Sequence, residues 1–313
     1  MDIQPKKDVH LASHTVFKVG GTARFFHEAN TKEDLVAGLR WAKKYDLPFF
    51  ILGAGSNTLA ARKEFPGLVI KSMCSSVAVM GNSIVAEAGA MMPRVSARAL
   101  AEGLSGFEWA SGVPGTVGGS VRGNAGCFGK SMADVVESVE VYDALLDRQK
   151  KIAGGDCDFA YRSSIFKRHP EYVVLAATIS LAAAERAAIQ ERMRSHALHR
   201  VSTQDIGAQC AGCAFKNVAW DDLSRATREK LFSKIPEAAQ FKNATHLPAA
   251  FLLDRLGLKG YAIGAAMVSK KHANFLINTG GATAHEIAML VSHCKEHVHR
   301  TTGILLEEEI QYL

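Results

Sequence analysis

The glycine-rich stretch at residues 110–126 is the part of this sequence that most clearly points to chemistry. Its sequence is ASGVPGTVGGSVRGNAG, with six glycines and Arg122 as its one charged residue. Glycine weakens helices and strands through backbone entropy, so a fold keeps such a stretch where a ligand must lie against the main chain. A flexible linker would not interleave valines in this way. The stretch therefore predicts binding of a flat or phosphate-bearing group.

A second glycine-rich segment, GAGSNT at residues 53–58, follows an apolar run. Its main-chain N–H groups could form a concave anion site. The segment is not GxGxxG with a downstream acid, and it lacks the Lys-Ser/Thr pair of a P-loop. Taken alone it is typical of a tight turn. Anion binding and a plain turn therefore both remain open for it.

Two short motifs could bind metal. Cys210 and Cys213 form a CxxC, which is typical of zinc sites and dithiol redox centres. A structural zinc would need two further ligands, and the sequence has no second CxxC. His293 and His297 belong to an HxxEH pattern, but only 16 residues follow it. We expect an ordinary C-terminal helix with cations near its end and predict no metal.

Helix and strand patterns must position these motifs. A capping box from Asn30 to Glu33 predicts a helix with an apolar face. A buried strand is expected at residues 47–52, ended by Gly53, and Pro93 favours the start of a helix that stops at Gly103. Further strands are expected at residues 68–70, 83–87, 135–142, 172–181, 273–278 and 304–313, and further helices at residues 184–200, 247–257 and 283–299.

Composition limits the class of protein. The chain has 313 residues, 48% of them hydrophobic, which is ordinary for a soluble protein of two or three domains. It has no apolar run long enough to span a membrane and no apolar N-terminal core, so we expect a cytoplasmic protein. The net charge of +6 comes from scattered Lys and Arg, which favours small anionic ligands over nucleic acid. The six cysteines are expected to be thiols.

In combination, the motifs resemble the UDP-N-acetylenolpyruvoylglucosamine reductase family. They occur in that family's order: TVFKVGG at residues 15–21, LGAGSNTL at 52–59, SGVPGTVGGSVRGNAG at 111–126, YRSS at 161–164, AGCAFKN at 211–217, HANF at 272–275 and LEEE at 306–309. The glycine block alone is shared, in looser form, with other flavoproteins of the vanillyl-alcohol oxidase type. The full combination is specific to the reductase family.

The resemblance implies an α+β fold. It implies a two-part FAD-binding region of the vanillyl-alcohol oxidase type, followed by a C-terminal α+β substrate domain. We expect the first FAD subdomain at residues 1–68, joined by a C-terminal strand at 304–313, the second at 69–195, and the UDP-sugar domain at 196–303. The short interval between Arg162 and Cys213 resembles the family type that lacks an extra tyrosine loop.

The resemblance also implies a reaction. UDP-N-acetylglucosamine enolpyruvate would be reduced to UDP-N-acetylmuramate, a peptidoglycan precursor. NADPH would reduce FAD, whose N5 would then pass hydride to the vinyl carbon. Because NADPH and the sugar must reach the same flavin nitrogen, ping-pong kinetics are expected. The implied partners are these small molecules, with no nucleic acid, no membrane insertion and no obligatory protein partner.

Three residues match the catalytic positions of the family. Arg162 would face the substrate carboxylate, for which its planar fork is suited. Glu309 would be the acidic partner, with its pKa raised by the neighbouring carboxylate. Cys213 stands where the family usually has a proton-donating serine, and a thiol, with a pKa of about 8.5, is a stronger acid than an alcohol. Cys210 remains an alternative donor.

Other residues are expected to bind the cofactor and substrate. The expected FAD-binding residues are Gly53, Ala54, Gly55, Ser56, Asn57, Thr58, Gly112, Val113, Pro114, Gly118, Gly119 and Gly126. The expected substrate-binding residues are Tyr161, Lys216, Asn217, His272 and Asn274. Alternatives stay open: a different FAD oxidoreductase on the same scaffold, a non-catalytic UDP-sugar binding protein, and NADH in place of NADPH.

Overall fold

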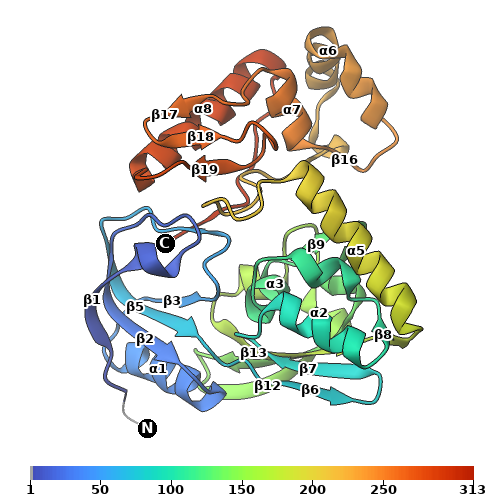
Figure 1. Ribbon diagram of the computed structural model, residues 1–313. Helices are drawn as coiled ribbons and strands as arrows, with labels where there is room; N and C mark the ends of the chain where they lie inside the picture. The colour runs from blue at the N-terminus through green and yellow to red at the C-terminus, as the bar shows by residue number, and fades with distance from the viewer. Residues whose placement is uncertain (1–2) are drawn as a thin grey trace. The chain divides into compact units, whose positions relative to one another are not determined.

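The computed structural model describes residues 3–313, which divide into two compact units. The first unit contains the described residues up to Val9, together with Thr22–Ala54 and Glu64–Ser202. The second contains His10–Gly21, Gly55–Lys63 and Thr203–Leu313. The chain thus passes between the units more than once before Ser202 (Figure 1). The expected division into three domains, with breaks after residues 68 and 195, stays a prediction.

The first unit is built on two main sheets. Its elements are β1 (Lys6–His10), β2 (Thr22–Ala29), α1 (Lys32–Lys44), β3 (Phe49–Leu52), β5 (Glu64–Ser72), β6 (Val77–Met80), β7 (Ser83–Glu87), α2 (Met92–Ala101), β8 (Leu104–Ser105), α3 (Val117–Arg122), β9 (Gly126–Cys127), β10 (Lys130–Ser131), β11 (Val136–Asp143), β12 (Arg148–Ala153), α4 (Ile165–Arg168), β13 (Tyr172–Ser180), β14 (Ala182–Ala183) and α5 (Arg186–Thr203). One sheet has the order β1–β2–β5–β3, with β2, β5 and β3 parallel. The other is antiparallel, in the order β12–β11–β13–β7–β6.

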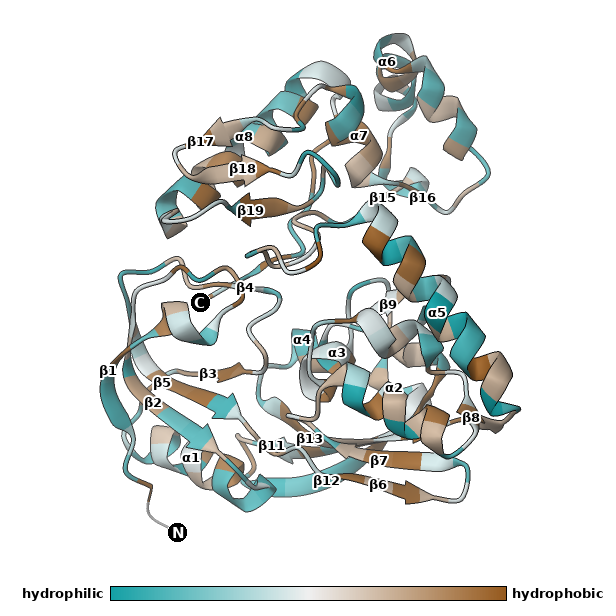
Figure 2. Ribbon diagram, viewed as in Figure 1, coloured by the Kyte–Doolittle hydropathy of each residue, from teal (hydrophilic) through white to brown (hydrophobic). Residues whose placement is uncertain are grey.

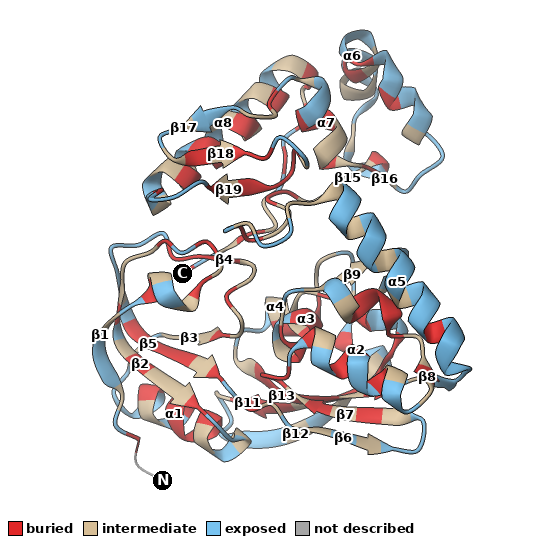
Figure 3. Cartoon of the chain, viewed as in Figure 1, coloured by how far each residue is buried: buried red, intermediate tan, exposed pale blue. Residues whose placement is uncertain are grey.

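Each sheet of the first unit buries one face against helices. Strand residues such as Ile84 and Val139 share a core with Val95 of α2 and Val117 of α3. Leu35 and the other apolar residues expected on one face of α1 are buried against the parallel sheet, as that periodicity predicts. Figure 3 shows these buried faces in red. The middle of the glycine-rich stretch, as α3, therefore packs on the antiparallel sheet.

The local sequence signals predict the helix ends closely. Pro93 lies in the first turn of α2, and Gly103 follows its end with φ +69°. For α1 the expected cap is wrong by one residue. Thr31, not Asn30, caps the helix by accepting a hydrogen bond from the Asp34 N–H. The Asp34 carboxylate accepts a hydrogen bond from the Asn30 main-chain N–H, so it bonds the residue before the cap.

Three strand expectations need correction. The segment 47–52 becomes β3, which begins at Phe49 and is a half-buried edge strand rather than a buried one. The segment 273–278 forms regular strand only as β19 (Leu276–Asn278). The C-terminal segment 304–313 forms strand only as β20 (Gln311–Tyr312), and its remainder is irregular. The apolar residues favour burial of all three segments. A segment forms a regular strand only where a neighbouring strand pairs with it.

The second unit has short strands and three helices within residues 3–313. Its elements are β4 (Thr58–Leu59), β15 (Val218–Ala219), α6 (Arg225–Lys234), β16 (His246–Leu247), α7 (Ala249–Arg255), β17 (Ala262–Ile263), β18 (Ala266–Val268), β19, α8 (Ala284–Thr302) and β20. The expected capping box opens α8, where Thr283 and Glu286 bond each other's main chain. Its apolar face packs against the sheet β17–β18–β19, whose strands are largely hydrophobic (Figure 2).

Helix α5 lies mostly exposed, with Ile189 as its buried residue (Figure 3). Arg192 anchors it by a bond of 2.8 Å to the buried carboxylate of Glu108. Burial of Glu108 opposes its ionisation, but hydrogen bonds from Arg192 and from main-chain N–H groups keep its pKa below the usual value. The helix is therefore held by polar contacts more than by a core. None of the helices among residues 3–313 is long and apolar enough to cross a membrane.

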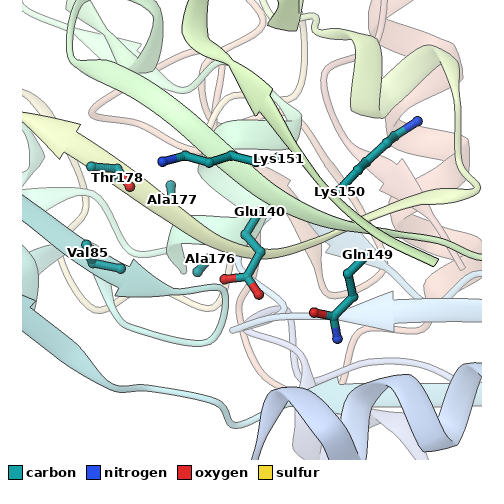
Figure 4. Close-up of a pocket in the computed structure, with 8 residues that line it drawn as sticks. All are labelled: Val85, Glu140, Gln149, Lys150, Lys151, Ala176, Ala177 and Thr178. Carbon is teal, nitrogen blue, oxygen red and sulfur yellow. The ribbon is translucent and has the colours of Figure 1, made fainter.

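A hollow of about 450 Å³ opens on the antiparallel sheet (Figure 4). Its lining residues are Val85, Glu140, Gln149, Lys150, Lys151, Ala176, Ala177 and Thr178. Lys150 and Lys151 point in opposite directions, as neighbours on a strand do (Figure 4). Glu140 is paired with Lys32 of α1 at 2.8 Å. None of the site residues expected from the sequence lines this hollow.

Candidate functional site

Arg162 lies in the first unit, on a turn that follows β12. The turn is closed by two main-chain hydrogen bonds between Ala160 and Ser163. Arg162 itself has φ +53°, a left-handed conformation that is uncommon for a residue with a side chain. Its guanidinium donates to the Gly126 carbonyl at 3.0 Å, and its Cζ lies 5.6 Å from the centre of the half-exposed Tyr161 ring. The main chain thus fixes the arginine in an unusual backbone state.

Cys213 lies in the second unit, on a segment that pairs on both sides. Cys213 forms a β-bridge with Phe275 on one side. On the other side Phe215 pairs with Glu308, and the Glu309 N–H donates to the Ala214 carbonyl at 2.8 Å. Main-chain pairing therefore brings the segments that contain Cys213 and Glu309 side by side. Arg162 and Tyr161 belong to the other unit, and their action together with these residues stays a prediction.

The three glutamates at residues 307–309 have different hydrogen-bond and ion-pair partners. Glu307 pairs with Lys216, and Glu308 pairs with Lys295 at 2.6 Å. Burial opposes ionisation of Glu308, but its bonds from Lys295 and Tyr312 lower its pKa. The main chain of Glu309 is held separately, because its carbonyl accepts from Asn57 at 3.1 Å. The raised pKa expected for Glu309 stays a prediction.

The expected substrate residues of the second unit surround the Cys213 segment. Both atoms of the buried Asn274 amide bond to the main chain of Phe215. Asn217 accepts from the Ala249 N–H at 3.1 Å at the start of α7. The His272 ring lies tilted against the Phe275 ring, with ring centres 4.4 Å apart. Its Nδ1 is buried without a hydrogen-bond partner within residues 3–313, and burial lowers its pKa. Substrate contacts of these residues and of Lys216 stay predictions.

The expected FAD glycines of the first unit differ in what surrounds them. A Cβ added at Gly53, Gly112, Gly118 or Gly126 would meet a neighbouring atom at 2.4–2.8 Å. Close packing inside the chain therefore explains those four glycines. Gly119 is different, because it is exposed and its Cβ would meet only Thr116 Oγ1 at 3.6 Å. A side chain at Gly119 would point into open space, and a bound ligand could occupy that space. Ala54 and Val113 are half-buried and Pro114 is exposed.

The remaining expected FAD residues, Gly55 to Thr58, lie in the second unit, and Asn57 and Thr58 contact the C-terminal segment. Gly55 has φ +66°, and a Cβ there would lie 2.4 Å from the His14 carbonyl oxygen. Asn57 donates to Glu309, and Thr58 begins β4, which pairs in parallel with β20. Ser56 is half-buried. The loop thus ties the end of the chain in place, and contact of these residues with FAD stays a prediction.

The side chains of the CxxC and HxxEH motifs differ in burial and in the contacts that they make. Within residues 3–313 no three His, Cys, Asp or Glu side chains gather as a metal site. Cys210 is buried, which raises its pKa, whereas Cys213 is half-buried. His293 of the HxxEH pattern stacks on Tyr261, with ring centres 4.1 Å apart. Among the described residues, the six cysteines are all free thiols.

Asn124 and Arg200 are at positions for which the sequence predicts no role in the site. The Asn124 side chain bonds both Ala160 and Ala133, joining the glycine-rich stretch to the Arg162 turn. Arg200 of α5 covers Gly112, where an added Cβ would lie 2.6 Å from its Cδ, and donates to Cys127 Sγ at 3.3 Å. For Asn124 a signal existed, since a lone amide residue among glycines is typical of a left-handed turn.

Comparisons with known proteins cover nearly the whole chain. Residues 23–145 match the model of an FAD binding domain, and residues 204–313 match the C-terminal domain of UDP-N-acetylenolpyruvoylglucosamine reductase. The reductase of Caldanaerobacter subterraneus is 36% identical over 96% of this chain and 91% of its own length. That of Synechococcus is 34% identical over 97% of this chain and 90% of its own length. The chain belongs to the UDP-N-acetylenolpyruvoylglucosamine reductase family.

A solved structure of this family agrees with that assignment. The reductase of Thermus caldophilus superposes with a TM-score of 0.76 at 29% identity, over 99% of this chain and 98% of its own. The family assignment and the α+β fold, with an FAD-binding region and a C-terminal domain of the reductase family, are confirmed. Cys213 as a substitute for the usual serine of the reductase family stays a prediction.

Proposed function

We propose that this chain is the FAD-containing reductase that converts UDP-N-acetylglucosamine enolpyruvate to UDP-N-acetylmuramate, with NADPH as reductant. The observation that supports the proposal is the main-chain pairing of the segments that contain Cys213 and Glu309, in a member of the reductase family. The product is a peptidoglycan precursor, so the enzyme serves cell-wall synthesis, cell shape and division. We place it in the cytoplasm, with small molecules as its partners.

The residues present fit FAD. Bound FAD supplies the transfer of hydride from NADPH to the vinyl carbon of the substrate. The exposed Gly119 and Pro114 leave the main chain of the stretch open to a flat ligand. Gly53 and Gly118 keep the loops packed closely on Thr116 and Ala88, which fixes the shape of that surface. These residues would hold and orient the cofactor.

Arg162 binds the substrate carboxylate. Reduction of the vinyl group places negative charge on the adjacent carbon and its carboxylate, and a fixed cation stabilises that charge as it develops. The guanidinium is held from one side by the Gly126 carbonyl, and its planar fork suits a carboxylate. Because its backbone is fixed in a turn, it needs little reorganisation when the charge appears.

Cys213 donates the proton that completes the reduction. A thiol donates at neutral pH more readily than an alcohol, because its ordinary pKa is about 8.5. The main chain of its segment is held by the bridges Cys213–Phe275 and Phe215–Glu308. Glu309, on the adjoining segment, acts as an acid that hydrogen-bonds the substrate carboxylate and shares its charge.

The experiment that tests the proposal follows NADPH consumption by the purified protein. The protein should be yellow, and it should consume NADPH when UDP-N-acetylglucosamine enolpyruvate is added, with UDP-N-acetylmuramate identified by mass spectrometry. Protein that neither retains nor binds FAD would contradict the proposal. So would NADPH consumption that depends on oxygen and not on the sugar, which would indicate an oxidase.

Replacing Gly119 with leucine is expected to weaken FAD binding at least about tenfold. The side chain would enter open space without disturbing the chain, so only a ligand in that space is affected. FAD affinity is measured by titrating the flavin-free protein. The matched control is Gly155→Leu, at an exposed glycine with nothing within 4 Å. Equal FAD affinity in both variants would remove Gly119 from the cofactor site.

A thiol reagent such as iodoacetamide is expected to inactivate the enzyme, with the UDP-sugar substrate protecting it. Cys213 and Cys127 are the half-buried cysteines among residues 3–313, and the others are buried. Burial raises the pKa of Cys127, which lowers its thiolate fraction and its reactivity. Cys213→Ser should therefore resist the reagent, whereas Cys127→Ser should be as sensitive as the native protein. The opposite pattern would move the reactive thiol to Cys127.

A further inference from the structure

The turn that carries Arg162 needs support from outside itself. Arg162 is a non-glycine residue with φ +53°, a conformation that costs about 1 kcal/mol or more. Such a residue persists only where its surroundings hold it in place. The Lys167 Nζ donates to the Arg162 carbonyl at 3.1 Å, which supports one side of the turn.

The glycine-rich stretch supplies further support. Three hydrogen bonds join its end to the turn. The Asn124 amide donates to the Ala160 carbonyl at 2.9 Å, and the Ser164 hydroxyl donates to the Arg122 carbonyl at 2.7 Å. The third is the bond of 3.0 Å from Arg162 itself to Gly126. The turn is thus attached to the stretch before, at and after the arginine.

Asn124 is the side chain of the stretch that makes this attachment. Its amide oxygen accepts from the Ala133 N–H at 3.0 Å, while its amide nitrogen donates to Ala160. The two partners fix which atom is oxygen and which is nitrogen, because an N–H needs an acceptor and a carbonyl needs a donor. The residue is 7% exposed and has φ +43°, which asparagine tolerates better than most residues.

We infer that Asn124 is a positioning residue for Arg162: it holds the 160–164 turn against the glycine-rich stretch and so sets where the guanidinium meets the substrate carboxylate. The inference rests on the proposed function. Asparagine is required because the site needs a donor and an acceptor on one short side chain. Aspartate would place a second oxygen against the Ala160 carbonyl, and glycine would keep the backbone but lose both bonds.

The first test measures ligand binding to the oxidised holoenzyme by calorimetry. UDP-N-acetylmuramate carries the carboxylate that Arg162 would face, and UDP-N-acetylglucosamine lacks it. Asn124→Asp and Asn124→Gly should bind the muramate about tenfold more weakly, while their affinity for the glucosamine stays within about twofold of the native value. The control variant is Asp46→Gly, an exposed left-handed residue of the same unit, which should bind both ligands normally.

The second test separates the two half-reactions. Flavin reduction by NADPH should be unchanged in both Asn124 variants, while reoxidation by the enolpyruvyl sugar should slow by about 10- to 100-fold. The defect should also depend on Arg162. In an Arg162→Lys background, Asn124→Gly should slow reoxidation by less than about threefold, because the residue acts through the arginine.

Several results would overturn the inference. One is equal weakening of both UDP-sugars, and another is equal slowing of both half-reactions, either of which indicates a general structural role. A third is full additivity with Arg162→Lys. These outcomes differ from failure of the proposed function, in which the native protein itself would not be reoxidised by the enolpyruvyl sugar.

Discussion

Replacing Cys213 with alanine is expected to slow reduction of the enolpyruvyl sugar by about 10²- to 10⁴-fold, the range that a positioned general acid contributes. Flavin reduction by NADPH should be unchanged, because that step needs no proton from this residue. The two rates are measured separately by stopped-flow absorbance under anaerobic conditions. A defect confined to the sugar half-reaction is the signature of a lost proton donor.

Two further variants test whether Cys213 is the proton donor. Cys213→Ser should keep substantial activity, since a hydroxyl at the same position can donate a proton. Cys210→Ala should behave like the native protein, because Cys210 is buried and its pKa is raised by burial. If Cys210→Ala showed the defect and Cys213→Ala did not, the donor role would belong to Cys210. Full activity in both would assign the proton to water.

Replacing Arg162 with alanine is expected to slow the sugar half-reaction by about 10²- to 10³-fold, as loss of one preorganised group at a developing charge does. Binding of UDP-N-acetylmuramate should weaken as well, because its carboxylate loses the guanidinium. Arg162→Lys should recover part of the rate, since a point charge replaces the planar fork. The measurement is single-turnover reoxidation of the reduced enzyme over a range of sugar concentrations.

The matched control for Arg162 is Arg148→Ala. Arg148 is exposed on β12, so its loss removes one positive charge from the same unit without touching the turn. If Arg148→Ala slowed the reaction as much as Arg162→Ala, the effect would come from overall charge. Normal rates in Arg162→Ala would remove the residue from the mechanism altogether.

Helix ends could be predicted from the sequence because their signals are local. The Thr283 and Glu286 exchange lies within four residues of chain, and Pro93 and Gly103 act through their own backbone angles. The error at α1 has the same origin. Asn30, Thr31, Glu33 and Asp34 offer two overlapping caps, and local chemistry does not choose between Asn30 and Thr31.

Strands at the site could not be predicted in this way, because their form depends on distant partners. Residues 304–310 run beside the Cys213 segment, yet among the described residues they contribute one isolated bridge to it, between Glu308 and Phe215. β3 is an edge strand because its one neighbour in the sheet is β5. Apolar pattern alone predicts burial of such segments but not the number of strands beside them.

The family motifs predict which residues form the site, but not which hydrogen bonds their side chains make. Asn57 and Asn274 stand in motifs that are expected to bind ligands, yet in this fold their amides hold the main chain of Glu309 and Phe215. Asn124 is at no position that the motifs predict to be functional, although its side chain bonds connect the glycine-rich stretch to the Arg162 turn. A polar residue in a motif can serve the ligand or the scaffold, and only its hydrogen-bond partners distinguish these roles.

One anaerobic titration tests the central claim most directly. The yellow holoenzyme is bleached with NADPH, and UDP-N-acetylglucosamine enolpyruvate is then added in the absence of oxygen. We predict that the flavin absorbance returns as one UDP-N-acetylmuramate forms for each flavin reoxidised. Flavin that stays bleached with the sugar present and recovers its colour only on admission of oxygen would contradict the account.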